Sequence, residues 1–182
     1  MSVHPQAAEV LAFWFEELEP KQWWVKDPAL DATIEKRFGE LHPAASACEL
    51  FEWRKTAAGR LAEVIVLDQS SRNLHRGTPR AFSQDPLALA LAQAAVAVGA
   101  DQQLPEDRRG FLYMPFMHSE SPRIHVRGAE LFGKLGEGMR DAAKHHRSIV
   151  DRFGRYPHRN EILGRASTAE ELEFLKKPGS SF

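Results

Sequence analysis

The sequence has one cysteine, no long apolar run and almost no net charge. Its 182 residues include 24 Lys or Arg and 25 Asp or Glu, which gives a formal net charge of −1 at pH 7. The single cysteine, Cys48, excludes an intrachain disulfide and a four-cysteine zinc site. The balanced charge argues against a surface dedicated as a whole to nucleic acid, so any preference for an anion must be local.

No stretch reaches the roughly 18 uncharged apolar residues of a membrane span. The segment from Met1 to Pro5 also lacks the basic and apolar parts of a signal peptide. These absences, with the single cysteine, predict a cytoplasmic protein that has neither a membrane nor a nucleic acid as a partner. The hydrophobic fraction of 43% is ordinary for a globular protein. We expect one domain over residues 1–182, with the last few residues disordered.

Alternating runs rich in β-branched residues are missing, whereas apolar residues recur at helical spacing along most of the chain. The sequence therefore predicts an all-α fold of antiparallel helix hairpins with about eight or nine helices. Proline, glycine and capping residues mark the expected boundaries. The expected helices begin near Pro5, Asp27, Glu49, Ala58, Asp85, Pro105, Ser121, Gly138 and Ser167.

Three local predictions are more specific. The helix from Asp85 to Gly99 is apolar almost all round, so it should be central and wrapped by the others. The segment from Tyr113 to Ser121 contains Pro115 and should form a break or a tight loop. Ser167 and Glu170 should form the capping box of the last helix.

The expected helix from Ala58 to Arg76 places charges on its buried side. At about 100° per residue, its apolar stripe continues into Asp68 and Arg72, which should both point inward. One interpretation is an internal ion pair that fixes the helix end. The other is a functional site, because desolvation cancels most of the Coulomb gain of a buried pair. Asn73 and Arg76 lie on the adjoining arc, where they either extend this site or form a solvated face.

Histidines supply the candidate proton carriers. His146 interrupts the core stripe of the expected Gly138 to Phe153 helix, so it should be buried and hydrogen-bonded. His118 and Glu120 follow an aromatic run, and a carboxylate near an imidazole can orient that ring for proton transfer. These residues and His158 are all potential metal ligands, but their spacing matches no HExxH or comparable motif. We therefore predict no metal and no cofactor.

The turn after this helix carries Arg155, His158, Arg159 and Asn160 in a short stretch. Guanidinium groups in such a turn suit a phosphate or a carboxylate. The alternative is a helix C-terminus whose solvated arginines complement the helix dipole. Walker A, dinucleotide-binding and nucleophile-elbow motifs are absent from the sequence, so no reaction is indicated.

Two function classes follow. The first is a pocket for a small anionic ligand, a phosphate ester or a carboxylate, and an enzyme that acts on such a ligand belongs to this class. In this pocket the end of the Ala58 to Arg76 helix packs against the Gly154 to Asn160 turn. The second is a scaffold that binds a peptide or protein, with the charges as internal salt bridges. Buried pairing of these charges favours the second class. The candidate ligand-binding residues are Arg72, Asn73, Arg76, Arg155, Arg159 and Asn160, and the candidate catalytic residues are His118, Glu120, His146, His158 and Asp68.

Sequence segments in these same regions resemble those of a bacterial family known as domain of unknown function 924. They include Leu67 to Gly77, Tyr113 to Glu120, Phe153 to Asn160 and Leu163 to Thr168, and the resemblance covers nearly the whole chain. The resemblance implies a helical fold similar to that of tetratricopeptide-repeat proteins, a two-layer array of helix hairpins. It implies no established activity.

Overall fold

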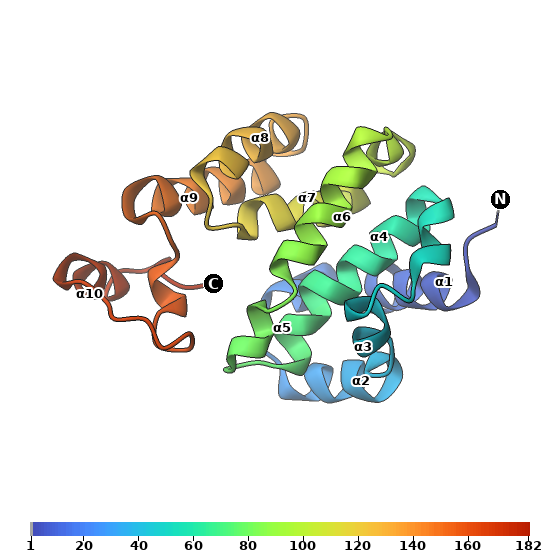
Figure 1. Ribbon diagram of the computed structural model, residues 1–182, viewed down its shortest axis with the longest axis horizontal. Coiled ribbons are helices and arrows are strands. Elements are labelled where there is room, and N and C mark those ends of the chain that lie inside the picture. The colour runs from blue at the N-terminus through green and yellow to red at the C-terminus, as the bar shows by residue number, and fades with distance from the viewer. Residues whose placement is uncertain (1) are drawn as a thin grey trace. The chain divides into compact units, whose positions relative to one another are not determined.

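The computed structural model describes residues 2–182, and all regular structure in this range is helical (Figure 1). Eight of its α-helices have seven residues or more, which confirms the all-α prediction. No helix in the described range is long and apolar enough to cross a membrane. The chain forms two compact units. The first comprises the residues up to Arg76 together with Arg80–Pro115, and the second comprises Gly77–Pro79 together with Phe116–Phe182. A single domain stays a prediction.

The first unit contains seven α-helices joined by short 3-10 or π segments. They are α1 (Pro5–Ala12), α2 (Pro28–Phe38), α3 (Leu41–Ser46), α4 (Ala57–Ile65), α5 (Ser71–Leu74), α6 (Asp85–Ala97) and most of α7 (Glu106–His118). The short segments are η1 (Phe13–Glu17), η2 (Pro20–Trp24), η3 (Phe51–Lys55), η4 (Val66–Ser70), η5 (Pro79–Phe82), which begins at the edge of the second unit, and η6 (Ala100–Gln103).

Capping residues explain where the helices of the first unit begin. The Asp27 carboxylate accepts the backbone N–H of Ala29 at 2.9 Å and caps α2. The Thr56 hydroxyl accepts the N–H of Gly59 at 3.0 Å and caps α4. From Ala57 to Leu74, α4, η4 and α5 follow one another without a break, as the expected helix in this region requires.

α7 continues through Pro115 to His118, so the predicted break is wrong from Tyr113 to His118, whereas Ser119 to Ser121 leave the helix as predicted. A proline inside a helix costs about 3 kcal/mol or more, because it removes a hydrogen bond and clashes with the preceding turn. All side chains from Phe111 to Met117 are buried. Since burying one large apolar side chain contributes ~1.5–3 kcal/mol, packing outweighs the cost of the proline.

α6 is not wrapped by other helices on all sides, so the prediction of a central helix is wrong. Ala88, Ala92 and Ala95 are fully buried and form a stripe on the helix, which packs against α4, η4 and η6. The leucines of α6 are only half-buried, and Val98 just beyond its end is 63% exposed. Small side chains let one face pack closely, and the uniformly apolar composition does not reveal which face that is.

The second unit contains the end of α7, α8 (Pro122–Phe132), α9 (Glu137–Phe153), η7 (Pro157–Arg159) and α10 (Ala169–Leu175). α8 and α9 lie side by side (Figure 1). Gly154 ends α9 in the left-handed conformation at φ 69°, where glycine pays no steric cost. Ile149, Val150 and Tyr156 form a buried cluster at this end of α9.

The capping box of α10 lies one residue later than predicted, at Thr168 and Glu171 rather than at Ser167 and Glu170. The Glu171 carboxylate accepts the backbone N–H of Thr168 at 2.8 Å, and the Thr168 hydroxyl accepts the N–H of Glu171 at 3.2 Å. This register turns Glu171 inward and leaves Glu170 exposed. The inward carboxylate pairs with Arg155, so this register brings an ion pair that Glu170, which is exposed, does not form with Arg155.

Candidate functional site

Asp68 is fully buried at the centre of a charged cluster in the first unit. Its Oδ1 lies 3.4 Å from Nη1 of Arg72, one helical turn later, so both charges point inward as predicted. The Arg72 guanidinium also donates to both carboxylate oxygens of Asp85, at 2.9 and 3.1 Å. Two carboxylates therefore hold this guanidinium.

Asp31 in α2 binds Asn73 and Arg76, the other two candidate ligand-binding residues of the first unit. Arg76 donates to both of its carboxylate oxygens at 2.7 Å, and the Asn73 amide donates to one of them at 2.8 Å. Burial acts to raise the pKa of Asp31, but the hydrogen bonds from Arg76 and Asn73 outweigh it and hold the pKa below its ordinary value. Sequence reasoning missed Asp31 because 45 residues separate it from Arg76.

Arg155 forms the corresponding ion pair in the second unit. Its Nε and Nη2 donate to the two carboxylate oxygens of Glu171 at 2.6 and 2.7 Å, and Nη2 also donates to the carbonyl of Ala166 at 2.9 Å. The Arg155 hydrogen bond lowers the pKa of Glu171 to about 2, against the opposing effect of burial. This guanidinium thus ties the end of α9 to α10.

Glu120 joins three segments of the second unit. Its carboxylate accepts two hydrogen bonds from Arg165 at 2.6 and 2.9 Å and one from the backbone N–H of Tyr156 at 2.8 Å. Burial acts to raise the pKa of Glu120, but these hydrogen bonds outweigh it and lower the pKa. Arg165 also donates through Nε to the buried amide oxygen of Asn160 at 3.0 Å, and Asn160 donates to Ser167 at 3.1 Å.

His146 is buried, with 8% of its surface exposed, and its Nδ1 lies 2.8 Å from the carbonyl oxygen of Ala142. Both parts of the prediction for this residue are confirmed. Burial lowers the pKa of His146 to about 3, and the nearby His118 adds to this effect. The rings of His118 and His146 lie 6.2 Å apart. His146 is therefore a neutral imidazole, with Nδ1 donating to the backbone.

Arg159 is 5% exposed, and its guanidinium lies 4.7 Å from the centre of the Tyr156 ring. The Tyr156 hydroxyl donates to the Met117 carbonyl and lies 3.3 Å from Nε2 of His125. His125 in turn lies 2.8 Å from the Ser119 carbonyl. Tyr156 is thus the buried centre around which the turn after α9 is arranged.

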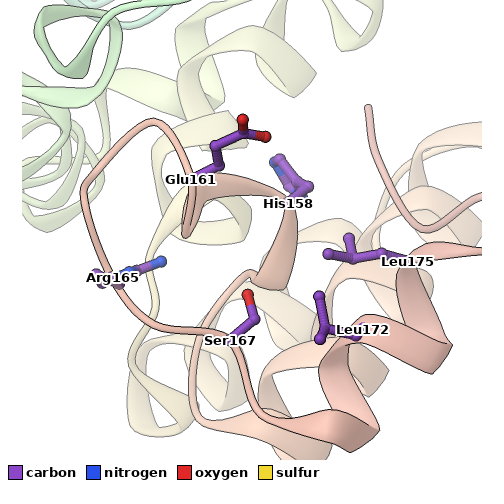
Figure 2. Close-up of a pocket in the computed structure, with 6 residues that line it drawn as sticks. All are labelled: His158, Glu161, Arg165, Ser167, Leu172 and Leu175. Carbon is purple, nitrogen blue, oxygen red and sulfur yellow. The ribbon is translucent and has the colours of Figure 1, made fainter.

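A groove of about 500 Å³ lies between this turn and α10. Figure 2 shows Leu172 and Leu175 of α10 on one side, with His158 and Glu161 across from them and Arg165 and Ser167 on the loop that closes the groove. Its size falls within the range of ordinary ligand sites. Because Arg165 is paired with Glu120 and Glu161 brings a further carboxylate, the groove has no excess of positive charge.

The predicted site residues divide between the two units. Asp68, Arg72, Asn73 and Arg76 belong to the first, whereas His118, Glu120, His146, Arg155, His158, Arg159 and Asn160 belong to the second. That the two sets share one site stays a prediction. Within residues 2–182, no three His, Cys, Asp or Glu side chains are grouped so that they could hold a metal ion.

The fold and these contacts define an all-helical protein in which Arg72, Arg76, Arg155 and Arg165 are paired with carboxylates of their own unit. The model of a family described as a bacterial protein of unknown function, DUF924, matches residues 10–179, so the chain belongs to this family. It is also similar to the solved structure of a protein of unknown function, ATU0120, from Agrobacterium tumefaciens. The two are 42% identical with a TM-score of 0.90, over 93% of this chain and 96% of the other. No curated protein matches the chain.

The buried His146 predicts a loss of stability on mild acidification. Its pKa is about 3 in the folded protein against an ordinary 6.5, so the unfolded state binds more protons throughout this interval. The stability that His146 contributes above pH 6.5 is therefore lost as the pH falls, by about 2 kcal/mol at pH ~5. Burial also lowers the pKa values of His42, His75 and His125, so these side chains add to the loss in the wild type and in a His146 variant alike. Glu171, whose pKa falls from 4.5 to about 2, acts only at lower pH.

Urea unfolding of the wild type and of His146→Leu at about pH 7.5 and about pH 5 measures this loss. The variant should lose about 2 kcal/mol less than the wild type between the two conditions, because leucine fills a similar volume and cannot be protonated. An equal loss in both proteins contradicts the contribution assigned to His146.

Proposed function

We propose that this protein is a helical scaffold that binds a short peptide segment of a partner protein in the groove beside α10. The charged motifs then serve as internal salt bridges that hold the helices of each unit together. A tetratricopeptide-repeat-like array of helix hairpins is consistent with this role, because such arrays present grooves to extended peptides.

One observation carries the proposal. Three guanidinium groups that the sequence assigned to an anionic ligand each donate two hydrogen bonds to a carboxylate of their own unit: Arg72 to Asp85, Arg76 to Asp31 and Arg155 to Glu171. A ligand anion would have to displace these carboxylates and leave them uncompensated. Glu171 is 2% exposed, so its displacement carries a desolvation penalty.

The lining of the groove favours a peptide over a small anion. Leu172 is 52% exposed and Leu175 is half-buried, so together they offer an apolar surface for one side chain. Glu161 on the opposite wall offers an acceptor and Ser167 on the loop offers a donor, which suit the N–H and C=O groups of a peptide backbone. A small anion would face the Glu161 carboxylate at this wall.

Selection of peptides from a displayed random library, followed by affinity measurement on groove variants, tests the proposal. Leu172→Asp should weaken the selected peptides at least roughly tenfold, because it places a charge where an apolar side chain binds. Val126→Asp is the matched control, since Val126 is similarly exposed at 50% and lies on α8 of the same unit. Its affinity should equal that of the wild type.

Two results overturn the proposal. One is equal binding of the selected peptides to the Leu172→Asp and wild-type proteins. The other is a failure to select any peptide while inorganic phosphate or a small carboxylate raises the melting temperature, which would return the protein to the anion-pocket class.

A further inference from the structure

The end of α9 and the turn that follows it form a cup of rings around Phe182. The centre of the Phe182 ring lies 3.9 Å from that of His146, 4.6 Å from that of His158 and 5.4 Å from that of Tyr156. The Tyr156 and His158 rings are inclined to the Phe182 ring by 90° and 69°, and the His146 ring by 46°. The edge-to-face contacts of Tyr156 and His158 lie at separations that are favourable between aromatic rings.

Contacts that do not involve Phe182 hold two of these rings in position. The Tyr156 hydroxyl donates to the carbonyl of Met117, and the His146 ring is hydrogen-bonded to Ala142 within its own helix. The rings of His146 and Tyr156 also contact each other, with their centres 5.9 Å apart. The cup therefore belongs to the helix and the turn, and the C-terminal segment enters it.

The segment that carries Phe182 is held just before the ring. The carbonyl of Gly179 lies 2.7 Å from Nε2 of His145, and the Ser180 hydroxyl donates to the carbonyl of Leu175 at 3.0 Å. Gly179 is left-handed at φ 74°, which turns the chain back toward α9. Phe182 as a residue remains 47% exposed.

We propose that the cup of His146, Tyr156 and His158 is a binding site for one aromatic side chain, and that Phe182 occupies it as an internal ligand. His158 also lines the groove beside α10, so the cup continues that groove. A peptide with an aromatic residue next to the part bound by Leu172 and Leu175 displaces Phe182 and fills both sites. This last step rests on the proposed function, whereas the aromatic site does not.

A peptide copy of the C-terminal segment tests the site directly. The probe is the hexapeptide Lys177 to Phe182, and its control is the same peptide with alanine in place of phenylalanine. A chain truncated after Lys176 should bind the probe at least roughly tenfold more tightly than the control peptide. The untruncated protein should bind the probe more weakly than the truncated one, because its own Phe182 competes.

Variants of the cup separate the aromatic contact from the backbone contacts of the segment. In the truncated chain, His158→Ala should remove most of the preference for the phenylalanine peptide, and Leu172→Asp should leave it unchanged. Circular dichroism and the melting temperature of each variant check that the unit is folded. Equal affinity for the phenylalanine and alanine peptides, or equal binding by the truncated and untruncated chains, overturns the aromatic site without bearing on the groove.

Discussion

Replacement of Arg155 by alanine is expected to lower the melting temperature by roughly 10 °C. The change leaves the Glu171 carboxylate buried without the cation that donates two hydrogen bonds to it. A buried charge without its partner destabilises the folded state far more than the loss of an exposed pair does. Differential scanning calorimetry of the purified variant measures the shift.

Arg152→Ala is the matched control for Arg155→Ala. Arg152 lies one turn earlier on α9 and pairs with Glu170 of α10, but both side chains are exposed, at 47% and 62%. Its removal should change the melting temperature by no more than ~2 °C. Equal shifts in the two variants, or an Arg155→Ala protein as stable as the wild type, contradict a structural role for the Arg155 ion pair.

Arg54→Ala is expected to destabilise the first unit by about 3–5 kcal/mol. Arg54 in η3 donates to both carboxylate oxygens of Glu63 at 2.7 Å, and the Glu63 side chain is 1% exposed in α4. The variant leaves this carboxylate buried and unpaired. Denaturant unfolding at neutral pH measures the difference in the free energy of unfolding.

Two further variants show whether the loss of stability comes from the buried, unpaired Glu63 carboxylate. Lys55→Ala removes an exposed pair with Glu52 from the same η3 segment and should change stability by less than ~1 kcal/mol. The double replacement Arg54→Met with Glu63→Met should recover much of the loss, because neither charge is then left buried alone. If the double variant is no more stable than Arg54→Ala, lost packing rather than the charge explains the result.

The sequence predicts the helices well where local chemistry decides them. Gly154 ends α9 in the left-handed conformation, and Asp68 and His146 are each buried as the periods of their own helices require. Local rules fail at Pro115, where the surrounding burial outweighs a helix-breaking residue. They also fail at α10, where Ser167 and Thr168 both fit a capping box and the box at Thr168 comes with the ion pair between Glu171 and Arg155.

The partners of the charged residues could not be predicted from the sequence. Arg76 and Asp31 are 45 residues apart, as are Arg165 and Glu120, and no periodicity connects such positions. The sequence therefore shows arginines that need an anion, while the fold supplies that anion from another helix. For the same reason the groove beside α10 could not be predicted, because its walls meet only after α10 has packed on the turn.

The pairing of Arg72, Arg76 and Arg155 with carboxylates of the protein itself is what makes these charges structural. Nuclear magnetic resonance of arginine Nε–H groups during a titration with inorganic phosphate tests it most directly. We expect that the signals of Arg76 and Arg155, whose Nε atoms lie 2.7 and 2.6 Å from carboxylate oxygens, do not move at millimolar phosphate. Saturable movement of either signal would show that a small anion reaches that arginine, and this result would contradict its pairing with the protein's own carboxylate.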